Sequence, residues 1–536
     1  MGDVPNAVRI WYREFGEPLT TLYMIITRPT QPPSGSARFE SRGGRRELPA
    51  YRSKHTLEDC IVVEVFRKMA SKKHATLPTG AGMDDTSSFA PVGFKPTQLL
   101  EIELSRPLPA LTPHDDSCGQ PYERGLALIK LHNRPIGSVG FDFSKAALDP
   151  LTLADRINTV LRSEIDAHLA ADGLDAVPLE STGLPLAHPP RCVEERQRFL
   201  ARAPFVSVIV ATRDRPEQLL RCLRSLDALD YPAFETIVVD NAPSSDATER
   251  LLTDEYPGST RVRYVREQRP GLASAHNRGL QELSGQSRIV AFTDDDVICD
   301  PLWLCELVYG FEAAESVGCV TGMIYPSELE TWPQALIEQF GGFNKGYRRL
   351  VFDLHSHRPN DPLFPYAPGR FGSGANMAFR VETLKRIGGF DPVLGAGTLA
   401  LGGDDLAAFF SVVVGGETLV YEPAAVVHHA HHRDYAALHR QIRGYGVGLT
   451  AYLTRSLIHR PSLLLDVARR VPLGLRYALS PNSSKNQKKR SDYPIELTAL
   501  ERKGMLIGPV AYFHSWLGAR RHKRRRGPMA AADKER

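Results

Sequence analysis

Long apolar runs are missing from this sequence. Nowhere does it carry the roughly 20 consecutive apolar residues that a helix needs to cross a bilayer. The N-terminus has no basic segment followed by an apolar run and a cleavage site, so we expect no signal peptide. Cysteine is also scarce, with seven scattered residues and no metal-type pairing. An odd set without a disulfide framework indicates reduced thiols and a cytoplasmic protein.

A large excess of either charge is absent as well. The net charge is +4, and the hydrophobic (42%) and charged (24%) fractions are those of an ordinary globular protein with a real core. The 536 residues are enough for two or three domains. Positive charge is concentrated near the C-terminus, in the run Arg520-Arg-His-Lys-Arg-Arg-Arg526.

Composition and apolar spacing divide the chain into four segments. A hairpin around Asn133 and Arg134 and a helix from Leu153 to Leu169 predict a small accessory α+β module. The predicted segments are a poorly defined N-terminal segment (1–95), the accessory module with its linker (96–200), an α/β domain (201–435) and a helical, basic C-terminal region (436–536).

Apolar runs alternate with segments of helical spacing from residue 204 onwards. Phe205–Thr212 and Phe234–Asn241 are nearly continuous apolar runs, as in strands buried on both faces of a parallel sheet. A third strand is expected at 261–265 and a fourth just before Asp294. The alternation predicts βαβ units, so the expected fold class is α/β, with a mostly parallel sheet flanked by helices.

Three consecutive carboxylates, Asp294, Asp295 and Asp296, end the fourth strand. An unpaired buried carboxylate costs several kcal/mol or neutralises itself, so the triplet should lie at the C-terminal edge of the strand. Ligands of open α/β sheets bind at that edge, and Asp240, which ends the second strand, should converge on it. Clustered acids repel one another unless a cation joins them, and Mg2+ and Mn2+ prefer oxygen ligands. The alternative for an isolated triplet is a solvated acidic loop.

Five motifs, in order within residues 205–432, resemble the family 2 glycosyltransferases with the GT-A fold. The motifs are Ser207-Val-Ile-Val-Ala-Thr-Arg-Asp-Arg-Pro216, Glu235-Thr-Ile-Val-Val-Asp-Asn241, Gly271-Leu-Ala-Ser-Ala-His-Asn-Arg-Gly279, Phe292-Thr-Asp-Asp-Asp-Val297 and Gly402-Gly-Asp-Asp-Leu406. The resemblance implies a GT-A domain at 201–435. It also implies transfer of a hexose-type sugar from a nucleotide-diphosphate sugar to a hydroxyl, with inversion at the anomeric carbon.

The resemblance implies a divalent metal, Mn2+ or Mg2+, at the acid triplet. Asp294 and Asp296 match the family's metal-binding acids, and a metal bridging the diphosphate stabilises the charge that grows as the sugar leaves. Asp294 and Asp295 would also border the donor; for Asp295 the alternative is that it faces a helix or solvent. The family commonly supplies a histidine as a further ligand, and the flanking residues favour His429 within the histidine run 428–432. A zinc site built from the histidines alone is the alternative.

Further donor-binding residues are carried over from the family. Asp240 resembles the carboxylate that accepts a hydrogen bond from the nucleotide base, and Thr212, Arg213 and Arg215 lie on the neighbouring loop. For the two arginines the alternative is solvent-facing loop charge.

Two asparagines complete the expected donor site. Asn277 would border the nucleotide, with helix packing as the alternative. Asn376 lies in a glycine-rich turn that allows close backbone approach, as in the family's segment at the donor sugar. The family often has arginine where this chain has His276, so no role is carried to that position.

The acid pair Asp404-Asp405 occupies the place of the family's Gly-Gly-Glu-Asp motif. The resemblance implies that Asp405 is the catalytic base, which takes the proton from the acceptor hydroxyl as its oxygen attacks. Asp404 replaces the family's glutamate with a side chain one methylene shorter, which puts its acceptor-binding role in doubt. The alternative for the pair is favourable placement of acids at a helix N-terminus.

The C-terminal region suits an interface more than a catalytic fold. Residues 504–519 carry aromatic side chains and no strong charge, and the basic run follows directly, as in an interfacial helix on anionic lipid. The alternatives are a helix packed on the body and nonspecific binding to nucleic acid, a partner that we consider unlikely. The expected location is cytoplasmic, with peripheral attachment to the inner face of the plasma membrane as an option.

The expected partners are a nucleotide-sugar donor and a glycan, lipid or small-molecule hydroxyl acceptor. Two other classes of protein compete with this interpretation. A nucleotidyltransferase also places paired acids and Mg2+ at the end of a parallel sheet, but it should carry a basic triphosphate loop, which we do not find. A glycan- or nucleic-acid-binding protein without turnover would not need acids at 240, 294–296 and 405 together.

Overall fold

The structure is a computed structural model that describes residues 94–525, except 118, 144–146, 185–187 and 484. The predicted N-terminal segment, 1–95, lies almost entirely outside the described residues. The side chains of the basic run that begins at residue 520 lie outside them too.

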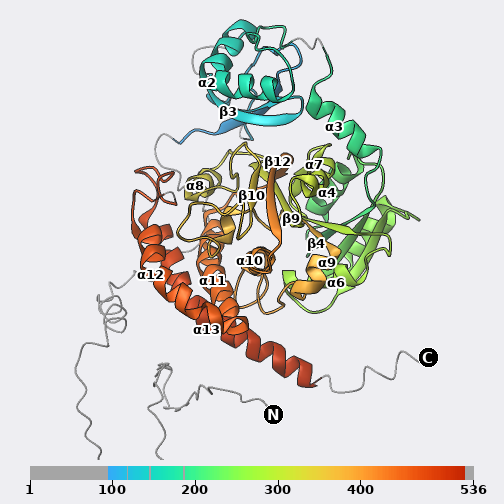
Figure 1. Cartoon of the computed structure of the whole chain (residues 1–536), viewed down its shortest axis with the longest axis vertical. Helices are drawn as coiled ribbons and strands as arrows, with labels where there is room; N and C mark the ends of the chain where they lie inside the picture. Colours follow the sequence, from blue (N-terminus) through green and yellow to red (C-terminus); the bar gives the residue numbers. More distant parts are fainter. Residues whose placement is uncertain (1–93, 118, 144–146, 185–187, 484, 526–536) are drawn as a thin grey trace, which may run out of the picture. The chain divides into compact units, whose positions relative to one another are not determined.

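A three-stranded sheet and one long helix form the segment that the sequence predicted to be an accessory module, called the module below (Figure 1). Strand β1 (Thr97–Glu103) pairs in parallel with β2 (Arg124–Leu131), and β2 forms the predicted hairpin with β3 (Arg134–Asp142). Helix α2 (Pro150–Ala171) buries one apolar stripe against this sheet, at the spacing that indicated a helix.

A short helix, α3 (Arg191–Leu200), which was not predicted from the sequence, connects the module to the large domain. Its Arg196 is buried and donates to the Glu306 carboxylate over 2.7 Å and to the His132 carbonyl over 3.1 Å. Arg134, from the module, donates to the same carboxylate over 3.3 Å. The two guanidinium groups supply the opposite charge that the fully buried glutamate needs.

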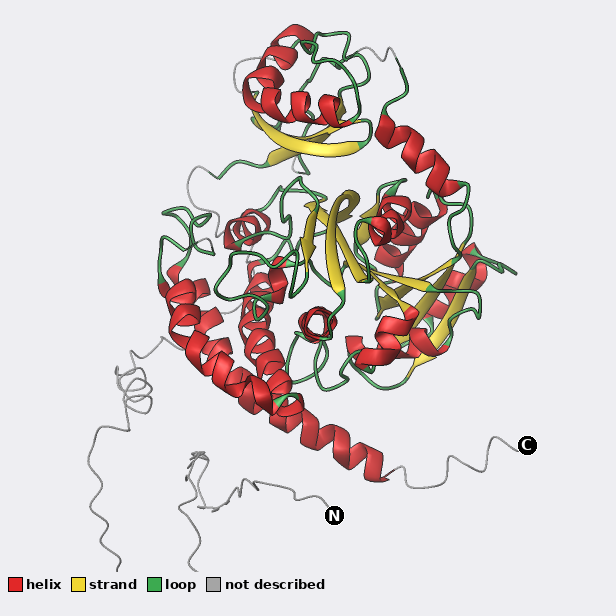
Figure 2. Cartoon of the chain, in the orientation of Figure 1, coloured by secondary structure: helices red, strands yellow, loops and turns green. Residues whose placement is uncertain are grey.

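The large domain is built on one sheet with the strand order β10-β12-β9-β11-β7-β4-β5-β6. The half of the sheet that comes first in the sequence is the predicted set of parallel strands. These strands are β4 (Val206–Thr212), β5 (Phe234–Asn241), β6 (Val262–Glu267) and β7 (Ile289–Asp294). Three helices follow the strands at the predicted places: α4 (Pro216–Asp227), α5 (Ala247–Glu255) and α6 (Leu272–Gln281). Helices flank the sheet, which confirms the α/β class (Figure 2).

The other half of the sheet is mixed instead of parallel. It contains β8 (Val297–Cys299), β9 (Val317–Pro326), β10 (Leu350–Phe352), β11 (Asn376–Arg380) and β12 (Thr418–His429). Strand β11 lies antiparallel between β7 and β9, whereas β12 runs parallel to β9. The helices of this half are α7 (Trp303–Tyr309), α8 (Trp332–Phe340), α9 (Val381–Ile387) and α10 (Asp404–Val414).

The C-terminal region is helical, as predicted, with α11 (Tyr435–His459), α12 (Leu464–Leu479) and α13 (Ile495–Arg525). Glycines let the α11 and α13 backbones touch: a Cβ added to Gly446 would meet the Glu501 carbonyl, and one added to Gly504 would meet that of Arg443. Tyr512 of α13, in the segment expected to lie on lipid, is buried in an apolar cluster with Ala451 and Tyr452 of α11. Among the described residues, no helix is both long and apolar enough to cross a membrane.

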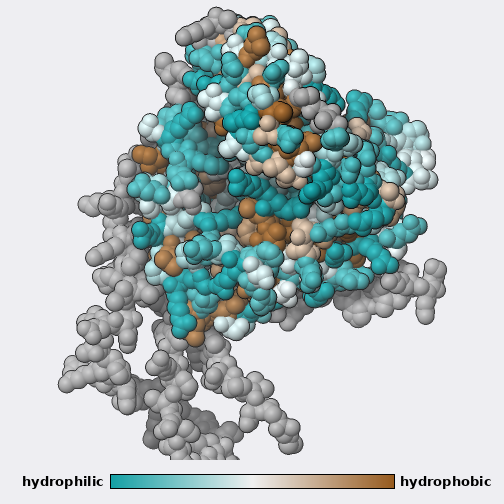
Figure 3. All heavy atoms as spheres, turned by 45° about the horizontal axis from the view of Figure 1, so that its top comes forward, coloured by the Kyte–Doolittle hydropathy of each residue, from teal (hydrophilic) through white to brown (hydrophobic). Residues whose placement is uncertain are grey.

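The molecular surface in Figure 3 is mostly hydrophilic on the face shown, with separate apolar patches. The apolar core lies on both sides of the large sheet, in two clusters of buried side chains. This packing fixes the ends of the strands, where the polar groups of interest lie.

Replacing Arg196 with methionine tests the attachment of α3. The change leaves Glu306 buried with only the longer Arg134 contact, so we expect a loss of about 3 kcal/mol in the free energy of unfolding, measured by urea denaturation. The control is Arg198→Met on the same helix, which breaks an exposed pair with Glu194 and should cost less than about 1 kcal/mol. Equal losses would contradict the role given to the buried pair.

Candidate active site

Three neighbouring strands, β4, β5 and β7, end at nearly the same level of the sheet, and two of them, β5 and β7, carry an acid there. In the sheet register, Thr212 of β4 lies beside Asp240 of β5, and Ala211 lies beside Asp294 of β7. The structure therefore brings Asp240 and the acid triplet to the same edge of the sheet.

Arg215 and Thr212 hold two acids of the triplet. Thr212 donates its hydroxyl to the Asp295 carboxylate over 2.7 Å. Arg215 donates from one nitrogen to Asp295 over 3.0 Å and to Asp296 over 3.2 Å. Asp295 is buried, and both of its carboxylate oxygens accept hydrogen bonds from this loop, whereas Oδ1 of Asp296 accepts none within the described residues.

Asp294, Asp296 and His429 place three potential ligand atoms within 4.8 Å of one another. Burial and the charges of Asp296 and Asp295 raise the pKa of Asp294 well above its usual value. Burial lowers the pKa of His429 to about 4, so this imidazole is neutral at physiological pH. The group thus offers two carboxylates and a neutral ring nitrogen, a donor set that suits Mn2+ or Mg2+ for its oxygens and Mn2+ for its nitrogen.

A chain of hydrogen bonds fixes the tautomer of His429. The His431 Nε2 lies 2.9 Å from a Glu338 oxygen, so this nitrogen carries a proton and donates it to the carboxylate. In a neutral His431 ring the other nitrogen, Nδ1, is an acceptor, and it lies 3.2 Å from His429 Nδ1. The Nδ1 of His429 therefore donates, and its Nε2 presents a lone pair.

That lone pair faces a carboxylate oxygen. His429 Nε2 lies 3.4 Å from Asp296 Oδ1, which is buried and has no hydrogen-bond partner within the described part of the chain. Two acceptors that face each other at this distance repel unless a proton or a cation lies between them. The neutral state of His429 removes the proton, so the arrangement fits a divalent cation held by Asp296, His429 and Asp294.

Asp240 is fully buried at the strand end. The Tyr264 hydroxyl donates to its Oδ2 over 3.1 Å, while its Oδ1 meets no donor among the residues that the structure describes. Burial raises the pKa of this carboxyl. A buried acceptor with an open lone pair is costly by itself, and a ligand N–H would satisfy it.

Asp405 is the second residue of α10 and is held by two backbone amides. Gly374 donates to its Oδ2 over 3.0 Å and Leu406 to its Oδ1 over 2.7 Å. Burial raises the pKa of the Asp405 carboxyl, while these bonds and the charge of Lys345 oppose that rise. Burial and the charge of Asp405 raise the pKa of the half-buried Tyr445 of α11.

Asp404 points away from Asp405 into a buried environment. Its Oδ2 lies 4.0 Å from His276 Nδ1 and is not hydrogen-bonded by any described residue. Burial and the neighbouring charge of Asp405 raise the pKa of Asp404 to about 7. Burial lowers the pKa of His276 to about 3, so the ring is neutral and packs between Phe292 and Phe390.

Three predicted donor residues have other contacts. Asn376 is fully buried, and its amide bonds Trp303 and two backbone carbonyls in the core. Asn277 bonds the backbone of Phe390 through both its oxygen and its nitrogen, which is the packing role left open by the sequence. Arg213 is exposed and lies 3.6 Å from Asp214. The structure does not bring these side chains to the acid triplet.

Sequence reasoning missed several residues that the structure brings to this edge. Lys345 lies near Asp405, and its burial lowers the pKa of its amine to about 8. Glu338 completes the histidine relay from α8, 93 residues before His431. Neither carried a local signal, because a single charged residue in an unmarked segment looks like solvated surface.

Comparison with known proteins identifies the domain that carries most of this site. Residues 207–388 match the family model "Glycosyl transferase family 2". This range includes Asp240 and the acid triplet and ends before Asp404, Asp405 and His429.

Three curated relatives match parts of the chain. The pre-mycofactocin glycosyltransferase of Mycobacterium tuberculosis is 26% identical over 284 residues, 52% of this chain and 51% of that protein. The O-antigen biosynthesis protein RfbC of Myxococcus xanthus is 31% identical over 213 residues, 38% of this chain and 16% of that protein. The uncharacterized protein y4gI of Sinorhizobium fredii is 31% identical over 197 residues, 36% of this chain and 21% of that protein. The chain thus spans about half or less of the length of these relatives.

Among solved structures, a mannosyltransferase of Pyrobaculum calidifontis in complex with GDP-Man and Mn2+ covers 59% of this chain and 92% of its own, with 20% identity and a TM-score of 0.36. A structural match with a TM-score this low does not support a conclusion about function. The family model and the curated relatives agree in one respect: residues 207–388 of this chain are similar to glycosyl transferase family 2.

Proposed function

We propose that the protein transfers a sugar of the hexose type from a nucleoside-diphosphate sugar to a hydroxyl acceptor, with inversion at the anomeric carbon. The observation that carries the proposal is the convergence of three different chemical groups on one sheet edge. The first is Asp240, whose buried Oδ1 has no hydrogen-bond donor among the described residues. The second is the set of possible cation ligands Asp294, Asp296 and His429, and the third is the Asp405 carboxylate, which backbone amides orient.

The donor binds at the ends of β4, β5 and β7. Asp240 Oδ1 accepts an N–H from the edge of the base, which satisfies its open lone pair. Asp294, Asp296 and His429 hold a divalent cation, which when bound neutralises charge on the diphosphate. Arg215 holds Asp295 and Asp296 in place and adds positive charge beside the diphosphate.

Asp405 is the base of the transfer step. It takes the proton from the acceptor hydroxyl while the acceptor oxygen forms a bond to the anomeric carbon. The bond from that carbon to the diphosphate oxygen breaks on the opposite side, and the nucleoside diphosphate leaves with the electron pair. Each Asp405 oxygen keeps one lone pair beyond the amide hydrogen bond that orients it, so the carboxylate is positioned to accept the proton.

We also propose that the protein binds an anionic lipid surface, which favours a lipid-linked acceptor. Leu464, Val471, Leu475 and Leu479 form one exposed stripe along α12. Exposed arginines at 469 and 476 border this stripe, as expected for a helix that lies in the interface of an anionic membrane. Helix α13 buries Tyr512 and exposes a second apolar stripe, formed by Leu506, Val510, Phe513 and Leu517.

Removing one ligand of the proposed cation should uncouple nucleotide binding from metal. We expect wild type to bind a nucleoside diphosphate much more tightly with Mn2+ than without it, and Asp296→Asn to lose this dependence because one carboxylate of the group is gone. Isothermal titration with UDP and GDP measures the affinity of each protein with and without Mn2+. Asp254→Asn, an exposed acid on α5, is the control and should behave as wild type. Equal wild-type affinity with and without Mn2+ would contradict the cation site.

Asp405→Asn should abolish turnover and spare donor binding. The amide keeps the shape of the side chain but cannot take a proton, so we expect kcat to fall by about 100-fold or more with little change in nucleotide affinity. Since burial raises the pKa of Asp405, wild-type activity should fall with decreasing pH earlier than for an ordinary aspartate, as the base becomes protonated. Initial rates of sugar transfer across pH check both. Unchanged turnover in the variant would exclude Asp405 as the base.

The lipid surface is tested by two substitutions on one helix. Leu475→Glu places a charge in the α12 stripe and should reduce co-sedimentation with phosphatidylglycerol vesicles. Leu473→Glu is the matched control, because Leu473 is similarly exposed but lies about 200° around the helix from Leu475. Binding reduced equally by both variants, or no binding by wild type, would refute the proposed surface.

A further inference from the structure

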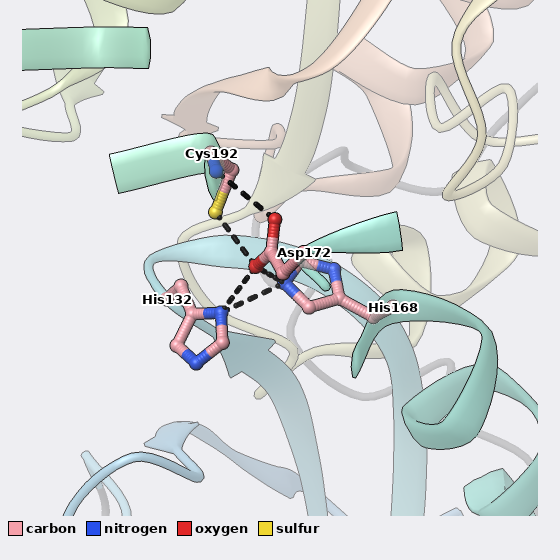
Figure 4. A group of neighbouring side chains, drawn as sticks. All are labelled: His132, His168, Asp172 and Cys192. Atoms are coloured by element: carbon pink, nitrogen blue, oxygen red, sulfur yellow. Dashed lines mark hydrogen bonds and ion pairs between the residues drawn. The ribbon is translucent and has the colours of Figure 1, made fainter. Parts of the chain in front are cut away.

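A second group of metal-ligand side chains lies in the accessory module, separate from the sheet edge. It consists of His132, His168, Asp172 and Cys192, whose ligand atoms all lie within 4.8 Å of one another. Figure 4 shows the two rings and the sulfur pointing toward one carboxylate oxygen. Asp172 Oδ2 lies 2.6 Å from His132 Nδ1, 3.2 Å from His168 Nε2 and 3.0 Å from Cys192 Sγ.

Three different elements supply these residues. His132 is in the tight turn between β2 and β3, His168 and Asp172 are one helical turn apart at the end of α2, and Cys192 is at the start of α3. The side chains of His132, Asp172 and Cys192 are almost completely buried. Such a set of strongly polar groups in a small apolar core requires compensation within the cluster.

The backbone at His132 indicates that its side chain is needed there. His132 and Asn133 both have positive φ, 56° and 64°, as in the two-residue turns that favour Asn and Gly. A histidine costs more in this position than either of those residues. The ring nitrogen Nε2 has no partner in the described structure, so the polar contacts of the ring are those it makes within the cluster.

Hydrogen bonds alone satisfy this cluster poorly. His132 Nδ1 and His168 Nε2 lie 3.1 Å apart, and both approach the same Asp172 oxygen together with the thiol. Either three protons converge on one oxygen with two N–H groups side by side, or one ring nitrogen lacks its proton and its lone pair faces the carboxylate oxygen. A single cation in the middle relieves both arrangements and turns the same four atoms into ligands.

We propose that His132, His168, Asp172 and Cys192 form a structural zinc site. Nitrogen, sulfur and carboxylate ligands in a set of four are those of closed tetrahedral zinc sites. With zinc–nitrogen and zinc–oxygen lengths of about 2.0–2.1 Å, neighbouring ligand atoms lie about 3.3 Å apart. The nitrogen–nitrogen distance of 3.1 Å and the His168–Asp172 distance of 3.2 Å are already close to this value.

Charge and orientation also fit a divalent ion. The thiolate of Cys192 and the carboxylate of Asp172 cancel the charge of Zn2+, which suits a buried site. The Cys192 backbone amide donates to Asp172 Oδ1 over 3.0 Å, which leaves Oδ2 directed at the centre of the cluster. Zinc binding releases the thiol proton to solvent, and no other reactant is required.

The site would join α3 to the module. Cys192 begins the helix that carries Arg196, one turn further on, to Glu306 of the large domain and to the His132 carbonyl. Zinc would thus hold the start of α3 against the hairpin turn, next to the buried ion pair. Its role is to fix the connection between the module and the large domain, and it does not depend on the proposed sugar transfer.

The experiment is metal analysis of the full-length protein purified from zinc-supplied cells. We expect one zinc per chain to remain after gel filtration in metal-free buffer. Replacement by Co2+ should give a thiolate-to-cobalt charge-transfer band that Cys192→Ala lacks. His168→Gln should also lose the zinc. The His168 side chain is partly exposed at the end of α2, so this variant decides the question if Cys192→Ala fails to fold.

Two controls separate this site from others. Cys319→Ala removes a buried thiol of the large sheet, and Asp296→Asn removes a ligand of the proposed catalytic cation; both should keep the zinc. Wild type that contains no zinc and takes up neither Zn2+ nor Co2+ would overturn the proposal. Full zinc content in His168→Gln and Cys192→Ala would overturn it as well.

Discussion

The concentration of negative charge at the end of β7 is the constraint on which this structure depends. Asp294, Asp295 and Asp296 are adjacent, and they lie where a parallel sheet directs its ligands. Thr212 and Arg215 hydrogen-bond Asp295, and Arg215 also donates to Asp296 over 3.2 Å. The other oxygen of Asp296, Oδ1, has no hydrogen-bond partner among the described residues and faces a neutral His429. The protein leaves this charge incompletely paired, and a divalent cation is the partner that the donor set fits.

Residues behind the site determine what its front can do. The relay from Glu338 through His431 orients His429, so the lone pair faces Asp296. The amide of Gly374, in the glycine-rich turn before β11, orients Asp405 in the same way. The orientation of His429 and that of Asp405 therefore depend on segments from the mixed half of the sheet or from the helix beside it. These segments lie outside the parallel strands that carry the triplet.

The sequence predicted the parallel half of the sheet because β4, β5 and β7 are apolar runs buried on both faces. It did not predict β9, although every residue there is buried, because glycines and a threonine interrupt the apolar pattern. The edge position of Asp240 and the triplet followed from strand ends. The sequence did not predict the core position of Asn376 or the contacts of Glu338 and Lys345, because residues distant in the sequence determine them.

The central claim is that Asp294, Asp296 and His429 hold the cation that meets a nucleoside diphosphate. Anomalous diffraction from crystals soaked with Mn2+ and a nucleoside diphosphate tests it most directly. The account predicts one manganese peak bonded to Asp296 and His429, in contact with the diphosphate, with the base against Asp240. Manganese bound elsewhere, or a diphosphate bound away from this sheet edge, would contradict it.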